Sequence, residues 1–281
     1  MNVSSFTETL KPNFRGIWIV SDETRTPDIV VYYCHGGGFS MGSSYFYMEF
    51  LLAWVTLLKE AGFANPALFA LEYSLVPDAV YPTQVEETIA GYKFVLSITE
   101  DPSKVCVSGD SAGATLILSM LLIISDHSEN RNQIPGLAML ISPWVTIISK
   151  KNKNSPSDYL NQQSLHLYGS QYIGTKVPQN DPIASPGLCR DPHRWKMASP
   201  SRGWCFVFGS EEVLAWECRD LIARLRKIGI QVDVHEEQGS IHAWPVATLY
   251  LGTTKESRLH ELRDVVQIIK RRFAFETKEN Y

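Results

Sequence analysis

A serine in a glycine-rich turn is the strongest chemical feature of the sequence. Gly109-Asp110-Ser111-Ala112-Gly113 follows an apolar stretch that predicts a strand and precedes an apolar stretch that predicts a helix. In this context the G-x-S-x-G pattern forms a tight turn that exposes the serine hydroxyl at the carboxyl end of the strand. Glycines at both ends let the strand and helix approach closely. An incidental serine in a glycine-rich turn is the alternative, but these flanks favour Ser111 as a nucleophile.

A second glycine-rich segment could stabilise negative charge. His35-Gly36-Gly37-Gly38-Phe39 directly follows the apolar run IVVYYC. Backbone amides of Gly36 and Gly37, with the amide of Ala112, could bind a developing oxyanion. A phosphate-binding loop is the alternative, but neither a G-x-G-x-x-G spacing nor a Gly-Lys-Ser/Thr ending is present. His35 is expected to shape this loop rather than to act as a base.

A nucleophilic serine needs a base, which in turn needs an orienting carboxylate. When the serine lies in a G-x-S-x-G turn between a strand and a helix, the order along the chain is serine, acid, histidine. Four histidines lie well beyond Ser111 in the sequence: His193, His235, His242 and His260. His242 lies just after the last expected strand, in GSIHAWP, where a loop can carry it back over Ser111. It is therefore the predicted base.

The acid is expected after the run WCFVFG, where the sequence reads Ser210-Glu211-Glu212-Val213-Leu214. One of these two glutamates could simply stabilise a helix start through the helix dipole. We favour Glu212 over Glu211 as the residue that orients the imidazole, on the position that this arrangement requires. Asp233 and Asp220 are weaker alternatives, because one lies within a strand pattern and the other two turns into a helix.

Short β-rich runs alternate with helical patterns from about residue 29 onward. The expected strands are DIVVYYC (28–34), ALFALEY (67–73), KVCVSG (104–109), LAMLISP (137–143), WCFVFG (204–209) and QVDVHEE (231–237). Helical patterns lie at about 45–61, 83–98, 112–125 and 212–227, and a final helix carries an apolar stripe from Leu259 to Phe273. Several runs are almost continuously apolar, as in parallel strands buried on both faces. The pattern predicts an α/β fold with a mostly parallel, doubly wound sheet.

One stretch interrupts this alternation. Residues 146–201 are rich in Lys, Asn, Ser and Pro and separate two strand candidates by more than a usual connection. We interpret them as a small inserted cap on a single domain spanning 1–281, preceded by a short N-terminal segment, 1–27.

Composition excludes several function classes. The 281 residues carry a formal charge of -4, so nucleic-acid binding is not expected. Apolar stretches such as LILSMLLII are too short to span a bilayer, and the N-terminus lacks a signal-peptide layout. Five cysteines without a CxxC pair fit a reducing, cytoplasmic environment. No cluster has metal-ligand spacing and no cofactor loop is visible, so neither a metal nor a cofactor is expected.

Together these motifs resemble the hormone-sensitive-lipase-like branch of the α/β-hydrolases. HGGGF and GDSAG match that branch, and Tyr73-Ser74-Leu75-Val76-Pro77 with Tyr81-Pro82 and Glu87 resembles its Y-x-L-x-P…P…E/D segment. The likeness is closest to fungal esterases related to sterol-acetate hydrolases and covers nearly the whole chain. It implies Ser111 as nucleophile, His242 as base, Glu212 in the register of the usual aspartate, and an oxyanion hole at Gly36, Gly37 and Ala112.

The HGGG motif begins unusually early for this branch, which normally uses a longer N-terminal segment to build half of its cap. Three explanations stay open: a reduced cap with an open cleft, a homodimer whose partner closes the cleft, or a truncated gene model. The membrane anchor of some sterol-acetate hydrolases is missing here, so a membrane-bound role is not carried over.

The expected function is a serine carboxylesterase that hydrolyses an acetyl or other short acyl ester of an apolar small molecule. Tyr47, Trp144 and Trp244 lie beside the motifs and are candidates for lining the cleft, with packing in the core as the alternative. A biosynthetic acyltransferase, thioesterase or lactonase acting on a secondary metabolite would use the same machinery. A non-catalytic ligand-binding protein on the same fold is the less favoured alternative.

Overall fold

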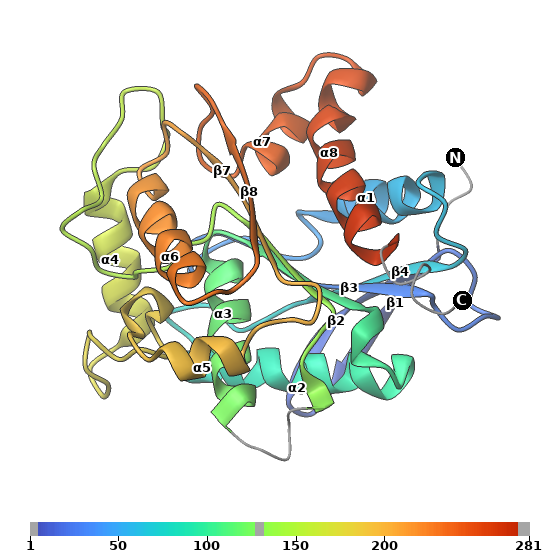
Figure 1. The fold of residues 1–281 in the computed structure, drawn as a ribbon, viewed down its shortest axis with the longest axis horizontal. Helices are drawn as coiled ribbons and strands as arrows, with labels where there is room; N and C mark the ends of the chain where they lie inside the picture. The colour runs from blue at the N-terminus through green and yellow to red at the C-terminus, as the bar shows by residue number, and fades with distance from the viewer. Residues whose placement is uncertain (1–4, 127–131, 275–281) are drawn as a thin grey trace.

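A computed structural model of the chain describes residues 5–126 and 132–274 and contains one eight-stranded sheet between two layers of helices (Figure 1). The strands are β1 (Ser5–Lys11), β2 (Phe14–Val20), β3 (Ile29–Cys34), β4 (Pro66–Leu71), β5 (Val105–Asp110), β6 (Leu137–Ile141), β7 (Trp204–Gly209) and β8 (Val232–Glu237). Their order is β1-β2-β4-β3-β5-β6-β7-β8. β1 pairs antiparallel with β2 and β2 antiparallel with β4, whereas all other pairs are parallel. The predicted α/β class and mostly parallel sheet are confirmed.

Helices cover both faces of this sheet. They are α1 (Met48–Glu60), α2 (Thr83–Thr99), α3 (Ala112–Asp126), α4 (Gln162–Ile173), α5 (Pro192–Met197), α6 (Ala215–Lys227), α7 (Trp244–Leu251) and α8 (Lys255–Ala274). Side chains of α1 and α8 form one apolar layer with the sheet, and those of α2, α3 and α6 form the other. The central strands β3 to β7 are therefore buried on both faces, which explains their almost continuously apolar sequences.

The N-terminal region differs from the expectation. No strand was predicted before residue 28, yet β1 and β2 form a hairpin in which Lys11 pairs with Phe14. The hairpin then joins the parallel sheet through β2 and β4, with Ile17 opposite Ala70. β1 is polar and lies at the sheet edge, so it lacks the apolar run by which the inner strands were recognised.

Two boundaries near the candidate site also differ from the predicted ones. β6 ends at Ile141 because Ser142 adopts a left-handed backbone with φ of 43° and Pro143 has no amide hydrogen to donate. α6 begins at Ala215 rather than at residue 212, so Glu212 lies in the turn that follows β7. Both differences place polar side chains in loops at the carboxyl ends of parallel strands.

Residues 146–201, which the sequence analysis interprets as an insertion and which we call the inserted segment, contain α4, a short 3-10 turn at Pro186–Leu188 and α5. At the start of this segment, the hydroxyls of Thr146 and Ser149 donate hydrogen bonds to the buried carboxylate of Glu217 on α6. Arg224 on α6 donates to the carbonyls of Gly187 and Cys189 near its end. Two α6 side chains therefore tie the inserted segment to the body of the fold.

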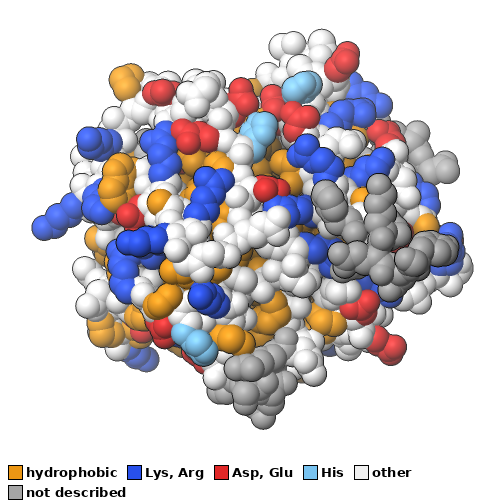
Figure 2. All heavy atoms as spheres, viewed as in Figure 1, with side chains coloured by type: hydrophobic (Ala, Val, Ile, Leu, Met, Phe, Trp, Pro, Cys, Tyr) orange, Lys and Arg blue, Asp and Glu red, His pale blue; other side chains and the backbone are white. Residues whose placement is uncertain are grey.

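The exterior carries mixed charge. On the face in Figure 2, Lys and Arg side chains are interspersed with Asp and Glu, and apolar side chains lie between them. No helix within 5–126 and 132–274 has both the length and the apolar character needed to cross a bilayer.

Candidate active site

The backbone presents Ser111 at a strained turn between β5 and α3. Ser111 has a φ of 51°, a left-handed conformation that is costly for a residue with a Cβ. Neighbouring glycines make the turn sterically feasible, because a Cβ at Gly109 would lie 2.7 Å from the carbonyl oxygen of Cys34 and one at Gly113 only 2.0 Å from it. The Ser111 amide donates to the carbonyl of Ile141, which fixes the turn against β6. These contacts form the tight turn expected from the motif.

Ser111 lies in the wall of a cavity of about 640 Å³. Its walls come from the glycine loop after β3, the turn that carries Ser111, the start of α4 and the loop leading into α7. The lining side chains include Met41, Phe46, Tyr47, Tyr159, Leu160, Leu165, Tyr168, Val246 and Tyr250. Among the described residues, Asp110 and His242 line it, and no Lys, Arg or Glu does. Most of the wall is therefore apolar, with a few polar groups beside Ser111, as is common in small-molecule sites.

His242 lines the same cavity and is almost fully buried. It follows β8 in a loop that ends where Ala243, with φ of 50°, precedes α7. Its Nδ1 atom lies 3.8 Å from Oε2 of Glu212 and has no hydrogen-bond partner in the described part of the chain. A relative shift of about 1 Å would bring the pair to hydrogen-bond distance.

Glu212 is held by neighbours other than the histidine. Its Oε2 accepts hydrogen bonds from the Ser142 hydroxyl at 2.6 Å and from the Gly209 amide at 3.1 Å. The neighbouring Glu211 side chain is exposed and makes no such contact, whereas Glu212 is 4% exposed. This geometry supports the preference for Glu212, and it adds Ser142, which the sequence analysis did not single out.

The electrostatics around His242 favour its protonated form. Burial lowers the pKa of the imidazole, but the opposing effect of the Glu212 carboxylate, aided by Asp158 and Asp110, raises it above the usual value. A base with a carboxylate at Nδ1 is stabilised when it takes up a proton. The arrangement can therefore accept a proton from a hydroxyl such as that of Ser111.

The predicted oxyanion hole needs one correction. The amide of Gly36 donates a hydrogen bond of 2.8 Å to Oδ1 of Asp110, so it is not free to bind an oxyanion. Gly37 and Gly38, with φ of 109° and 62°, also line the cavity, and in the described structure their amides donate no hydrogen bond. The Ala112 amide is likewise uncommitted within the described residues. Gly38 therefore replaces Gly36 as a candidate donor.

Asp110 explains how the glycine loop is held. Its buried carboxylate accepts hydrogen bonds from the Tyr33 and Tyr47 hydroxyls at 2.6 and 3.0 Å, besides that from Gly36. Burial raises the pKa of Asp110, although the tyrosine hydroxyls and nearby histidines oppose this. His35 is also buried, its Nδ1 lies 2.7 Å from the Gly36 carbonyl, and burial lowers its pKa. His35 therefore shapes the loop, as expected.

The three aromatic candidates have different positions. Tyr47 lines the cavity, as expected. Trp144 is fully buried against Phe39, and Trp244 is buried near His235, and neither lines the cavity. Both tryptophans pack in the interior, which was the alternative interpretation.

The inserted segment supplies wall residues that the sequence analysis missed. Asn161, Ser164, Leu165 and Tyr168 all line the cavity from α4 and its N-cap. Their spacing of 3, 4 and 7 residues places them on one helix face. That spacing could have predicted a shared face, but not that this face covers Ser111.

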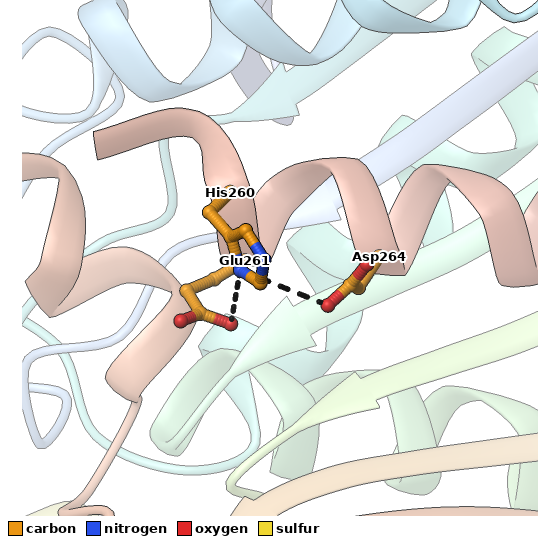
Figure 3. Close-up of side chains that lie close together, drawn as sticks. All are labelled: His260, Glu261 and Asp264. Carbon is orange, nitrogen blue, oxygen red and sulfur yellow. Dashed lines mark ion pairs between the residues drawn. The ribbon is translucent and has the colours of Figure 1, made fainter. Parts of the chain in front are cut away.

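One group of side chains in the described structure is close enough together to suggest a metal site: His260, Glu261 and Asp264 on α8 (Figure 3). The His260 imidazole lies 3.5 Å from Glu261 and 3.9 Å from Asp264. Its side chain is 66% exposed, and none of the three lines the cavity. These contacts are those of ordinary surface ion pairs, and we assign them no metal.

Relatives of known name match most of the chain. It is 29% identical over 216 residues to an acetyl-hydrolase of Streptomyces hygroscopicus, covering 75% of this chain and 67% of the relative. It is 28% identical over 225 residues to a Schizosaccharomyces pombe protein that bears the name steryl acetyl hydrolase mug81, covering 76% of this chain and 58% of the relative. The matched region thus spans about two thirds of the first relative and less of the second.

Solved structures share the fold. A hormone-sensitive lipase homologue from a metagenome library has a TM-score of 0.80 at 20% identity, covering 98% of this chain and 88% of that one. Carboxyl esterase 2 of the mycorrhizal fungus Tuber melanosporum has a TM-score of 0.77 at 21% identity, covering 96% and 87%. A sequence profile described as alpha/beta hydrolase fold matches residues 31–246. The resemblance inferred from the motifs is thereby confirmed, and the chain belongs to the alpha/beta hydrolase fold family.

Proposed function

We propose that this protein is a serine carboxylesterase that hydrolyses an acetyl or other short acyl ester of a neutral, apolar small molecule. The observation that carries the proposal is the shared cavity: Ser111 on its strained turn and His242 beside Glu212 both line it. A strained serine, a base and an orienting carboxylate are the parts that acyl transfer requires. The names of the two relatives, acetyl-hydrolase and steryl acetyl hydrolase, support the choice of an acetyl ester.

The reaction has two acyl-transfer steps. The Ser111 hydroxyl attacks the ester carbonyl while His242 takes its proton, and Glu212 stabilises the resulting imidazolium. Because Nδ1 faces Glu212, Nε2 is the nitrogen left to exchange protons with Ser111 and the substrate. His242 then protonates the leaving alcohol. Water, activated by the same imidazole, attacks the acyl-enzyme, releases the carboxylic acid and restores Ser111.

Backbone amides receive the negative charge of each tetrahedral intermediate. The donors are those of Gly37, Gly38 and Ala112, none of which has another acceptor in the described structure. Each such donor contributes on the order of 3 kcal/mol to the transition state. Asp110 contributes indirectly, because its bond to Gly36 anchors the strand-to-loop junction from which the other two glycines follow.

The apolar character of the substrate follows from the cavity walls. Aromatic and aliphatic side chains predominate, and a volume of about 640 Å³ accommodates a bulky alcohol beside a short acyl group. The inserted segment contributes Tyr159, Leu165 and Tyr168 to these walls and so acts as a cap.

We also propose a cytoplasmic location. All five cysteines are buried and unpaired, although their number would allow disulfides. Reduced, buried thiols that serve as small core side chains are typical of a reducing compartment.

Steady-state hydrolysis of p-nitrophenyl acetate, butyrate and octanoate by the native protein and by Ser111→Ala tests the proposed function. We expect turnover by the native protein, fastest with the short esters, and a loss of about 10⁴-fold or more in the variant. Retention of most of the turnover in Ser111→Ala would rule the mechanism out. Acyl transfer to an added alcohol or thiol in preference to water would instead favour the acyltransferase or thioesterase alternative.

A further inference from the structure

One side chain of the inserted segment, Asp158, contacts both the loop that carries Glu212 and the loop that carries His242. Its Oδ2 accepts a hydrogen bond of 2.8 Å from the amide of Val213, the residue directly after Glu212. Its Oδ1 accepts one of 3.3 Å from the amide of His242. A single carboxylate therefore joins the acid loop after β7 to the base loop after β8.

The neighbouring residue makes a further contact with the base. The Tyr159 hydroxyl donates to the carbonyl of His242 at 3.2 Å. Its ring lies 5.9 Å from the imidazole, with an interplanar angle of 64°. Asp158 and Tyr159 thus contact the backbone of His242 at its amide and at its carbonyl.

These contacts matter for the reaction because the imidazole and the acid stand on separate loops. The 3.8 Å separation of His242 Nδ1 and Glu212 Oε2 depends on where these loops place the two residues, besides the bonds of Glu212 to Ser142 and Gly209. The 2.8 Å bond from the Val213 amide has the length of a charge-assisted hydrogen bond, whereas the 3.3 Å bond from the His242 amide is longer. A misplacement of about 1 Å of a catalytic group costs on the order of 10²-fold in rate.

We propose that Asp158 is a positioning residue of the reaction: supplied by the inserted segment, it sets the relative placement of Glu212 and His242. This inference rests on the proposed function of the same site. Asp158 itself does not line the cavity, so it acts through the two loops rather than by touching substrate. Burial lowers the pKa of His242, and the negative charge of Asp158 adds to the larger opposing effect of Glu212, which raises it.

The test compares Asp158→Asn with Asp181→Asn. Asp181 is a control for loss of a carboxylate charge within the same segment: its Oδ1 accepts the amides of Ile183 and Ala184 at 2.8 and 2.9 Å and the Tyr81 hydroxyl at 3.4 Å, and none of these groups lies in the loops of Glu212 and His242. Asn is nearly the same size as Asp but has one acceptor oxygen, so one of the two loops loses its partner. With p-nitrophenyl acetate we expect Asp158→Asn to lower kcat by about 10- to 100-fold with KM within about twofold. Asp181→Asn keeps both constants.

A second readout does not depend on turnover. The pKa of the His242 ring, followed by NMR in the native protein and in Asp158→Asn, is expected to fall in the variant because a negative charge is lost. The acidic limb of the pH–rate profile moves to lower pH by the same amount. Circular dichroism and thermal unfolding of both variants show whether each is folded.

The outcomes separate the two proposals. An unchanged kcat and an unchanged His242 pKa in a folded Asp158→Asn overturn the positioning role and leave the esterase proposal intact. Equal losses of activity in the Asp158 and Asp181 variants overturn it as well, because they indicate a general effect on the inserted segment. A native protein without esterase activity contradicts the proposed function, and the NMR titration then still decides whether Asp158 acts on His242.

Discussion

The hydroxyl of Ser142 donates a 2.6 Å hydrogen bond to the carboxylate of Glu212. The Ser142 hydroxyl oxygen also accepts a 2.9 Å bond from the amide of Ala243, the residue after His242. Ser142 can serve both because its left-handed backbone ends β6 directly between β5 and β7. The loops that carry Glu212 and His242 are thus joined twice, once by Ser142 and once by Asp158.

Ser142→Ala is therefore expected to impair catalysis more than folding. The substitution removes a donor to Glu212 and leaves the Ala243 amide without an acceptor, and we expect kcat to fall by about tenfold or more. Ser108→Ala is the matched control, because that buried hydroxyl donates at 2.6 Å to the Met139 carbonyl, away from the acid and the base. Both variants should lose about 1 kcal/mol of stability, measured by urea unfolding. A Ser142→Ala protein with native kcat contradicts this role.

Glu212→Gln and Glu211→Gln test which glutamate orients the base. The amide keeps the size of the Glu212 side chain but cannot stabilise the imidazolium, so kcat is expected to fall by about 10³- to 10⁴-fold. Glu211 is exposed, and its variant is expected to keep native activity. Steady-state kinetics on a short acyl ester measure both. The reverse ranking would assign the acid to Glu211.

The pH dependence follows from the raised pKa of His242. Burial alone lowers it, but Glu212, Asp158 and Asp110 together raise it above 6.5. In the proposed mechanism the neutral imidazole is the base, so kcat/KM is expected to fall about tenfold for each pH unit below that pKa. Its contribution to stability has the opposite trend, since it is fully present below 6.5 and is lost as pH rises through the folded-state pKa.

A pH–rate profile measures the catalytic part of this prediction, with His260→Gln as control because its ring is 66% exposed on α8. We expect an acidic limb with a midpoint above 6.5 in both proteins. A midpoint well below 6.5 would mean that burial outweighs the three carboxylates.

The cavity predicts discrimination by charge. Because Asp110 lines the cavity and no Lys or Arg of the described residues does, an anionic group on the alcohol would lose its hydration and face a carboxylate, and His242 is occupied as the base of the proposed mechanism. We expect the acetate ester of a neutral apolar alcohol to be hydrolysed with kcat/KM at least about tenfold higher than an analogue with a carboxylate on the alcohol. Equal values would place the alcohol outside this cavity.

Local motifs made part of the site predictable. The spacing of Gly109, Ser111 and Gly113 reflects steric limits within five residues, so the strained turn could be inferred without any distant contact. The order of apolar runs likewise predicted the parallel sheet from β3 to β8. The polar edge strand β1 lacks such a run and was missed.

Long-range contacts decided what the sequence could not. Gly36 was expected to donate to the oxyanion, but its amide is bound by Asp110, 74 residues away. Trp144 and Trp244 are aromatic residues beside motifs, and local sequence does not tell a cavity wall from a packed interior. Asp158 lies in a stretch without periodicity, and its role is visible only once Val213 and His242 are brought beside it.

Mass spectrometry after reaction with a fluorophosphonate tests the central claim most directly, because the reagent captures a serine that is activated by its base and oxyanion donors. The account predicts one adduct, located on Ser111, which forms with the native protein, slows strongly in Glu212→Gln and is absent from Ser111→Ala. An adduct on another residue, or ester turnover by a protein whose Ser111 stays unlabelled, would contradict it.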